Sequence, residues 1–244
     1  MPLPDDFLFS QGSLQDYVDC PRRFRLRYLL RLAWPASEAG ALVESERRMR
    51  LGEAFHRLVQ QHALGIPETC LTGQVTDDEL RAWWRAYLDF ARSLPPTRAS
   101  EVVLSAPLAG YRLVARLDLL VVEGPRAVIV DWKTAPRRPS RRWLAERLQS
   151  RVYPYLLVRA GADWNDGQPF LPEQVEMVYW FADFPTDPQR FPYDAARYAA
   201  DGAWLTALIE EIASLGDEDY PPTVQERQCG HCVYRSLCSD AETR

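Results

Sequence analysis

Three charged residues near the middle of the chain have the types and spacing for metal-assisted phosphate chemistry. Asp131 and Lys133 end a β-branched run that starts at Val128, and alternation along a strand points both to one side. Asp118 lies in another apolar run, where a lone carboxylate is costly unless it is paired or binds a metal. Two carboxylates would attract Mg²⁺, and the ammonium would stabilise charge at phosphorus. The competing interpretation is an ordinary ion pair at a strand end.

A β-hairpin is the element that would bring these residues together. Strands are predicted over Tyr111–Val122 and Val128–Thr134, and the cluster Glu123–Arg126 between them is typical of a turn. Pro21 predicts a break in the first helix, whose expected N-cap is Ser13, and Pro154 predicts a bend in a later helix. Further strands are expected at Glu101–Leu108 and Gln174–Phe181, and helices at Ser10–Leu32, Glu44–Leu64, Asp77–Leu94, Trp143–Arg159 and Asp194–Leu215.

Composition indicates a globular protein of ordinary hydrophobicity. The chain has 244 residues, of which 47% are hydrophobic and 26% charged. It shows no basic segment followed by an apolar segment at its start and no apolar run long enough for a bilayer, so we expect a cytoplasmic protein without a membrane partner. In that compartment cysteines are reduced, metal-bound or catalytic.

The net charge of −5 excludes a uniformly basic nucleic-acid binder, but binding of nucleic acid at one site needs only a local positive groove. One arginine cluster lies near the N-terminus, and a second follows the Asp131 strand directly. The second cluster is the predicted nucleic-acid contact, and its alternative is a solvated helix face. The predicted contacts are Arg137, Arg138, Arg141 and Arg142.

The C-terminal region has the spacing of a metal or cluster site. Cys229, Cys232 and Cys238 form a C-x-x-C pair followed six residues later by a third thiol. Three cysteines need a fourth ligand, and four thiolates suit tetrahedral zinc or an iron–sulfur cluster. His231 keeps a zinc site open as an alternative, whereas Cys70 belongs to no pattern.

Asp118 followed by Asp131-Trp132-Lys133 resembles the PD-(D/E)XK nuclease superfamily, with Leu117 at the position of the proline in that name. The run from Ser13 through Cys20-Pro21 to Phe24 is similar to the N-terminal motif of RecB-like and AddB-like nucleases. The resemblance extends from Ser13 to Cys238.

The resemblance implies further site residues. His56 lies in a helical motif that starts at Gly52, and it would face the metal. The Trp132 carbonyl would complete the coordination shell of a metal bound by Asp118 and Asp131. Gln149 and Tyr153 match a Q-x-x-x-Y motif beside the active site, where one helix face carries both. Cys20 would join the three C-terminal cysteines as the remote ligand of a [4Fe–4S] cluster. Glu101 has two interpretations, an additional metal-shell acid or an ion-pair partner at a strand edge.

The implied fold is α/β, with a central mixed β-sheet flanked by helices as in restriction endonucleases. It would form a single nuclease domain over residues 1–244, with a catalytic core at 98–182 and a helical iron–sulfur clamp from residues 10–34 and 217–244.

The implied function is Mg²⁺- or Mn²⁺-dependent hydrolysis of DNA, as an exonuclease on single-stranded or end-processed DNA in repair, recombination or CRISPR-type defence. The sequence lacks a Walker A loop, so a helicase or another complex partner would supply any motor. The alternative is a catalytically silent DNA-binding or complex-forming subunit. A purely structural zinc protein would leave the carboxylates and the lysine unexplained.

Overall fold

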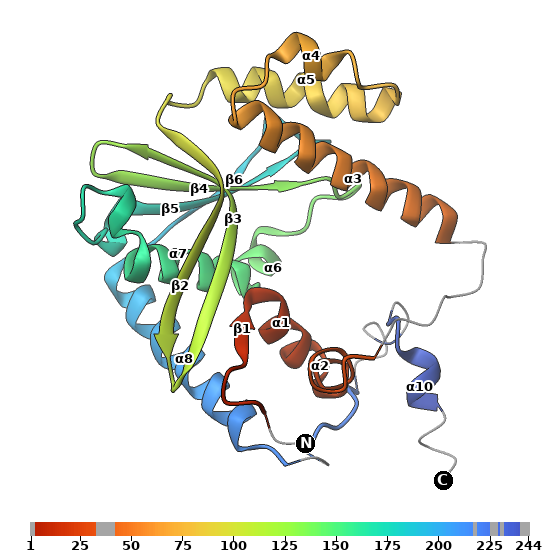
Figure 1. The fold of residues 1–244 in the computed structure, drawn as a ribbon, viewed down its shortest axis with the longest axis vertical. Helices are drawn as coiled ribbons and strands as arrows, with labels where there is room; N and C mark the ends of the chain where they lie inside the picture. Colours follow the sequence, from red (N-terminus) through yellow and green to blue (C-terminus); the bar gives the residue numbers. More distant parts are fainter. Residues whose placement is uncertain (1–2, 33–41, 217–218, 225–228, 230–231, 240–244) are drawn as a thin grey trace. The chain divides into compact units, whose positions relative to one another are not determined.

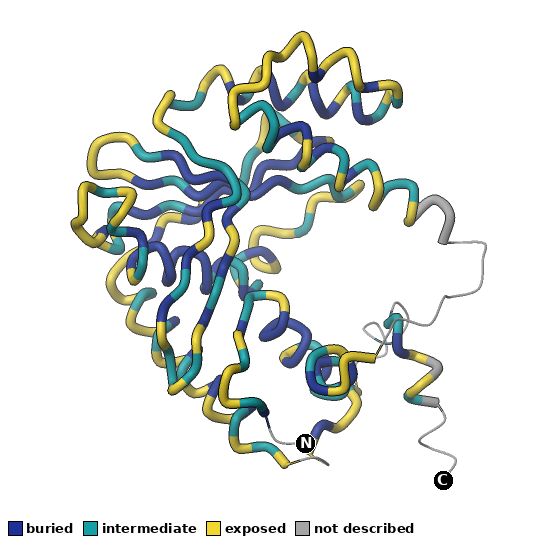
Figure 2. The backbone as a smooth tube through the Cα atoms, in the orientation of Figure 1, coloured by how far each residue is buried: buried dark blue, intermediate teal, exposed yellow. Residues whose placement is uncertain are grey.

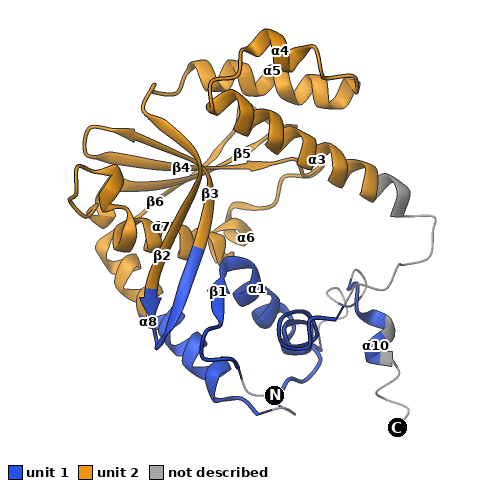
Figure 3. Ribbon diagram, in the orientation of Figure 1, with its two compact units in different colours: residues 1–40, 107–114, 203–244 blue, residues 41–106, 115–202 orange. Residues whose placement is uncertain are grey.

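The computed structural model describes residues 3–32, 42–216, 219–224, 229 and 232–239. His231 and parts of the two segments assigned to the clamp therefore lie outside the described residues. The chain forms two compact units (Figure 3). The first comprises residues 1–40, 107–114 and 203–244, and the second comprises residues 41–106 and 115–202.

The second unit is organised by the predicted hairpin. β3 and β4 pair antiparallel with Leu119 opposite Val130, and the turn between them contains Gly124 at a φ of +55°, which glycine adopts without strain. β4 continues into a parallel pair with β5, and β5 pairs antiparallel with β6. The α/β fold with a mixed sheet is thus confirmed. The strands are β2 (Arg98–Leu108), β3 (Tyr111–Glu123), β4 (Arg126–Lys133), β5 (Val175–Phe181) and β6 (Gln189–Pro192).

Helices flank this sheet on both faces (Figure 1). Val130, Trp132 and Trp180 of the strands pack with one group of helices into a buried core, seen as the dark blue segments of Figure 2. α7 packs on β5 from the other face, and α6 leads into it. The first group is α3 (Leu42–Ala63), α4 (Glu68–Thr72) and α5 (Asp78–Arg92), and the second is α6 (Arg141–Glu146) and α7 (Gln149–Ala160).

One predicted helix was wrong in detail. The helix expected over Trp143–Arg159 is two helices, because Arg147 has an extended backbone that ends α6. Pro154 lies inside the continuous α7, and the bend at that position stays a prediction. Short helical turns follow at Ala162–Trp164 and Pro172–Gln174, and β6 was not predicted because its four residues carry no clear alternation.

In the first unit the chain opens with a short strand that was also not predicted. β1 (Leu8–Ser10) pairs in parallel with the start of β3. Ser10, and not Ser13, caps α1 (Gln11–Asp19): its hydroxyl accepts from Ser13 N, while Ser13 Oγ accepts from Ser10 N. The break at Pro21 is confirmed, since Pro21 begins α2. The remaining elements are α2 (Pro21–Phe24), a π-helix (Arg25–Leu29) and α10 (Arg235–Ser239), and α8 (Ala195–Ser214) spans the boundary of the units.

Candidate active site

The hairpin places Asp118 beside the end of β4, as the sequence predicted. Asp118 Oδ2 accepts a hydrogen bond from Trp132 N at 3.0 Å, so its carboxylate is anchored to the main chain between Asp131 and Lys133. The Trp132 side chain points to the opposite face and is buried among the aromatic residues of α5. Strand alternation thus separates the charged face of β4 from its packed face.

Asp131, Lys133 and Gln149 form one polar cluster. Lys133 Nζ lies 2.6 Å from Asp131 Oδ2 and donates to Gln149 Oε1 at 3.0 Å. Gln149 Nε2 in turn donates to Asp131 Oδ1. The Asp131 side chain is only 3% exposed, and its Oδ2 has the lysine charge nearby but no aligned hydrogen-bond donor among the described residues. A buried carboxylate oxygen in this state is suited to a cation.

Burial and the neighbouring Asp131 charge raise the pKa of Asp118 well above the ordinary value for an aspartate. The hydrogen bond from the Trp132 main chain and the charge of Lys133 act in the opposite direction but do not cancel the increase. The pair therefore holds a proton in place of a second negative charge unless a cation binds.

His56 lies on α3 at the same carboxylate. Its Nδ1 is 3.7 Å from Asp118 Oδ2. Burial lowers the pKa of His56, although the charge of Asp131 opposes this change. A histidine that is neutral near pH 7 retains a nitrogen lone pair, which is the state that binds a metal.

Tyr153 completes the predicted set. It lies one helical turn after Gln149, is largely buried and hydrogen-bonds with Gln149. Burial, followed by the Asp131 charge, raises the pKa of Tyr153, so its phenol stays protonated. The structure thus brings together Asp118, Asp131, Lys133, His56, Gln149, Tyr153 and the Trp132 main chain.

Tyr179 of β5 is a site residue that the sequence interpretation did not identify. It is the register partner of Asp131, and the Lys133 ammonium lies 5.6 Å from the centre of its ring. Its hydroxyl hydrogen-bonds with Ser150 Oγ at 2.8 Å. The signal was the alternation of Val175, Met177 and Tyr179 along β5, but only the parallel register reveals its neighbour.

A close helix–strand approach fixes α3 at this site. A Cβ on Gly52 would lie 2.8 Å from Thr134 Oγ1, so a larger residue here would require the Thr134 side chain or α3 to shift. Arg48 Nε donates to Thr134 O at 3.0 Å, while its guanidinium also pairs with Glu79 and Asp183. α3 is thereby tied to the residue that follows Lys133.

The arginines of the loop after β4 have internal partners. Arg138 pairs with Asp187, and Arg142 pairs with Glu146 at 2.9 Å. Arg141 lies over the Phe191 ring at 4.4 Å and donates to a main-chain carbonyl. Arg137 is exposed. These contacts position the loop, and its role in binding nucleic acid stays a prediction.

The cysteines of the first unit are free thiols. Cys20 is buried at the junction of α1 and α2, and Cys229, Cys232 and Cys238 are partly buried. Burial raises the pKa of the Cys238 thiol, the charge of Arg22 lowers it, and the proximity of Cys232 and Cys20 raises it further. Cys70 is exposed on α4, in the second unit.

The donors at the acid pair fit a hard divalent cation. Within the parts of the chain that the structure describes, no three His, Cys, Asp or Glu side chains lie close enough to hold one ion. Mg²⁺, however, typically takes one or two carboxylates and completes its shell with water and phosphate oxygens. The Asp118–Asp131 pair meets that requirement, since Asp131 Oδ2 has the Lys133 ammonium beside it but no aligned hydrogen-bond donor in the described part of the chain. The cysteines do not present a closed four-thiolate site in the described residues.

Comparison with known proteins agrees with this fold and site. The family model of the PD-(D/E)XK nuclease superfamily matches residues 8–239. The chain therefore belongs to the PD-(D/E)XK nuclease superfamily. No curated protein matches the sequence.

Two solved structures are similar to this chain. One is a protein from Eubacterium rectale that is named as a proposed exonuclease, with a TM-score of 0.54 and 9% identity over 94% of this chain and 87% of that one. The other is SSO0001, with a TM-score of 0.44 and 15% identity over 97% of this chain and 88% of that one. The first similarity is one of fold. In the described residues, no helix is both long and apolar enough to cross a membrane.

Proposed function

We propose that the protein is a metal-dependent deoxyribonuclease that hydrolyses phosphodiester bonds. The observation that supports this proposal is the convergence of Asp118, Asp131 and Lys133 at one end of a hairpin, with His56 and Gln149 against them. The superfamily provides the substrate class, since its members are nucleases. A silent binding subunit would not require a buried acid pair beside a lysine.

Each residue has a distinct proposed role. Asp118 and Asp131, with the Trp132 main chain, would hold Mg²⁺ or Mn²⁺, which would supply positive charge to the phosphate oxygens and to the attacking water. His56, whose Nδ1 lies 3.7 Å from Asp118 Oδ2, would join them by moving closer to the bound ion. Lys133 stabilises charge at phosphorus or orients water, while Gln149 holds both Lys133 and Asp131 in position. Tyr153 supports Gln149 from the next turn of α7.

Lys133 is the only lysine in the sequence, since the other 28 of the 29 basic Lys and Arg residues are arginine. Arginine carries a planar, forked guanidinium, whereas lysine carries a compact ammonium on a flexible stem. The one lysine of the chain lies where its compact ammonium reaches both Asp131 and Gln149. This composition supports a chemical role for Lys133 beyond an ion pair.

Action on free or single-stranded DNA ends, in repair, recombination or defence, is the finer part of the proposal. The fold similarity to the protein named as a proposed exonuclease supports it. Incubation of the purified protein with end-labelled single- and double-stranded DNA, in Mg²⁺, Mn²⁺ or EDTA, tests it. We expect metal-dependent shortening from an end, and uncut DNA in every condition would contradict it.

We further propose that Cys20, Cys229, Cys232 and Cys238 bind a [4Fe–4S] cluster, as in AddB-like nucleases, with structural zinc as the alternative. The support is the spacing of the three C-terminal cysteines and the proximity of Cys20, Cys232 and Cys238 in the first unit. Such a cluster would be structural and tie residues near the two ends of the chain together.

A further inference from the structure

A cavity of about 530 Å³ opens beside the candidate active site in the second unit. Its wall includes His56 and Asp118, so a substrate in the cavity would contact the residues proposed to bind metal. Four of the other polar residues that line it have no role in the proposed chemistry. They are Arg57 and Gln60 of α3, Glu101 of β2 and Arg116 of β3.

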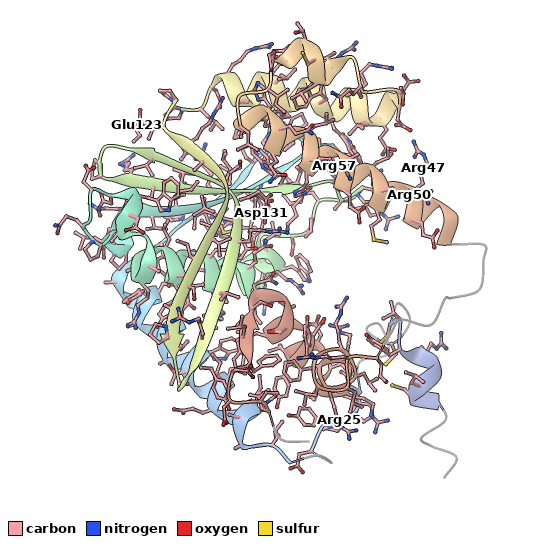
Figure 4. The ribbon with its side chains drawn as sticks, viewed as in Figure 1. Arg25, Arg47, Arg50, Arg57, Glu123 and Asp131 are labelled. Carbon is pink, nitrogen blue, oxygen red and sulfur yellow. The ribbon has the colours of Figure 1, made fainter. Side chains whose placement is uncertain are left out.

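Arg57 follows His56 directly on α3. It is exposed (Figure 4). Gln60 lies three residues further on, so both residues line one helix face. Among the described residues Arg57 has no ion-pair partner. Its charge is therefore available to an anion in the cavity.

Arg116 projects from β3 on the same face as Asp118, two residues away. Its side chain is 73% exposed, and its Nε lies 3.0 Å from Glu101 Oε2. A guanidinium has five N–H donors, so this pair leaves donors for a phosphate. Glu101 is thus an ion-pair partner at the strand edge, and it would compete with a phosphate for Arg116.

We propose that Arg57 and Arg116 bind a backbone phosphate of the nucleic acid next to the phosphate that is cleaved. This inference rests on the proposed function, since it takes the strand to be the substrate. The two arginines approach the cavity from α3 and β3, while Asp118 and His56 mark the place of the chemistry. Bidentate guanidinium–phosphate contacts would fix the register of the strand.

This anchor differs from the arginine loop after β4. Three of the four loop arginines have internal partners, whereas Arg57 has none among the described residues and Arg116 keeps free donors. The cavity is also lined by the acids Glu53, Glu101 and Asp118. Without a bound cation these acids would repel a phosphate, so we expect the anchor to work only with a divalent ion present.

The test measures binding separately from cleavage. Fluorescein-labelled single-stranded oligothymidylate is titrated in Ca²⁺, with intact DNA verified on a gel, for wild type, Arg57→Gln, Arg116→Gln and the double variant. Each single change should weaken binding about tenfold. The slope of log affinity against log salt should become shallower by about 0.7 for each phosphate that the variant no longer neutralises. Arg85→Gln, an exposed change on α5 outside the cavity, is the matched control and should bind like wild type.

Glu101→Gln gives a test of opposite sign. It removes a negative charge from the cavity and frees Arg116, so binding should become tighter. Unchanged affinity and salt slope in both arginine variants, equal to the Arg85→Gln control, would overturn the inference even if the wild type cleaves DNA. An absence of cleavage together with arginine-dependent binding would contradict the proposed function and leave the anchor standing.

Discussion

At the scale of single residues, Asp118 lies in the environment least suited to its charge. It is half-buried, it lies near the negative charge of Asp131, and its main compensation is one hydrogen bond from Trp132 N. Such an arrangement is unfavourable for folding by itself, because desolvation and like charge both oppose ionisation. A bound divalent cation would offset both effects. The carboxylate pair is therefore suited to binding a cation and does not stabilise the fold without one.

The raised pKa of Asp118 predicts an unusual pH dependence of stability. Over a range where the unfolded chain has lost this proton, the folded protein keeps it, so the folded state binds more protons and the free energy of unfolding falls as pH rises. In EDTA the melting temperature of wild type should fall from about pH 5 to about pH 8 relative to Asp118→Asn. Added Mn²⁺ should restore it in wild type only. Parallel profiles for the two proteins would refute this assignment.

Lys133 permits a test that few proteins allow. Replacement by methionine keeps the length of the side chain but removes the ammonium, and it should lower the cleavage rate by about 10²-fold to 10³-fold with little change in DNA affinity. An amine-reactive reagent should likewise inactivate wild type, since Lys133 and the α-amino group are the only amines of the chain. Inactivation of Lys133→Met at the same rate constant would show that the lysine is not the target.

At the scale of elements, the hairpin was predictable because two apolar runs flank a clear turn, and Asp118 and Asp131 follow from its pairing. The helix that carries His56 was predictable because the helical pattern extends over a long segment. Tyr179 was not, because its neighbour depends on a parallel register between segments more than forty residues apart. The sequence also carried no signal for the cavity cations Arg57 and Arg116, since only the fold brings α3 to β3.

The position of α3 beside the site depends on Gly52. Gly52→Ala should destabilise the protein by about 1–3 kcal/mol and reduce cleavage, because the new Cβ would lie 2.8 Å from Thr134 Oγ1. Adding Thr134→Ala to Gly52→Ala should restore stability, because it removes the oxygen that the new Cβ would meet. Gly73→Ala is the control, since its Cβ would meet only ordinary contacts at 3.6 Å. Denaturant unfolding measures the stability of wild type, Gly52→Ala, the double variant and Gly73→Ala. An unaltered free energy of unfolding in Gly52→Ala would mean that α3 or the Thr134 side chain shifts without cost.

At the scale of the whole molecule, the chain folds as two units that each collect distant segments. The first unit joins residues near both ends, which is the arrangement that a four-cysteine cluster would stabilise by closing a very long loop. The spacing of the cysteines is visible in the sequence, but the identity of the metal is not, because zinc and iron–sulfur clusters accept the same thiolates.

The cysteine proposal predicts a brown protein after anaerobic purification, with about four irons per chain. Cys20→Ala should lose the colour and lower the melting temperature, because the buried thiol is a proposed ligand. Cys70→Ala is the control and should change neither, since that thiol is exposed in the other unit. One zinc per chain without iron or sulfide would replace the cluster with the zinc alternative.

The central claim is that Asp118, Asp131 and Lys133 form a metal-dependent hydrolytic centre. The most direct measurement is single-turnover cleavage of end-labelled DNA in Mn²⁺ by wild type and by Asp131→Asn, a change that keeps the shape of the side chain but removes its charge. We expect cleavage by wild type and a decrease of at least about 10²-fold in the variant, with its circular dichroism spectrum unchanged. Equal rates for the two folded proteins would contradict the claim.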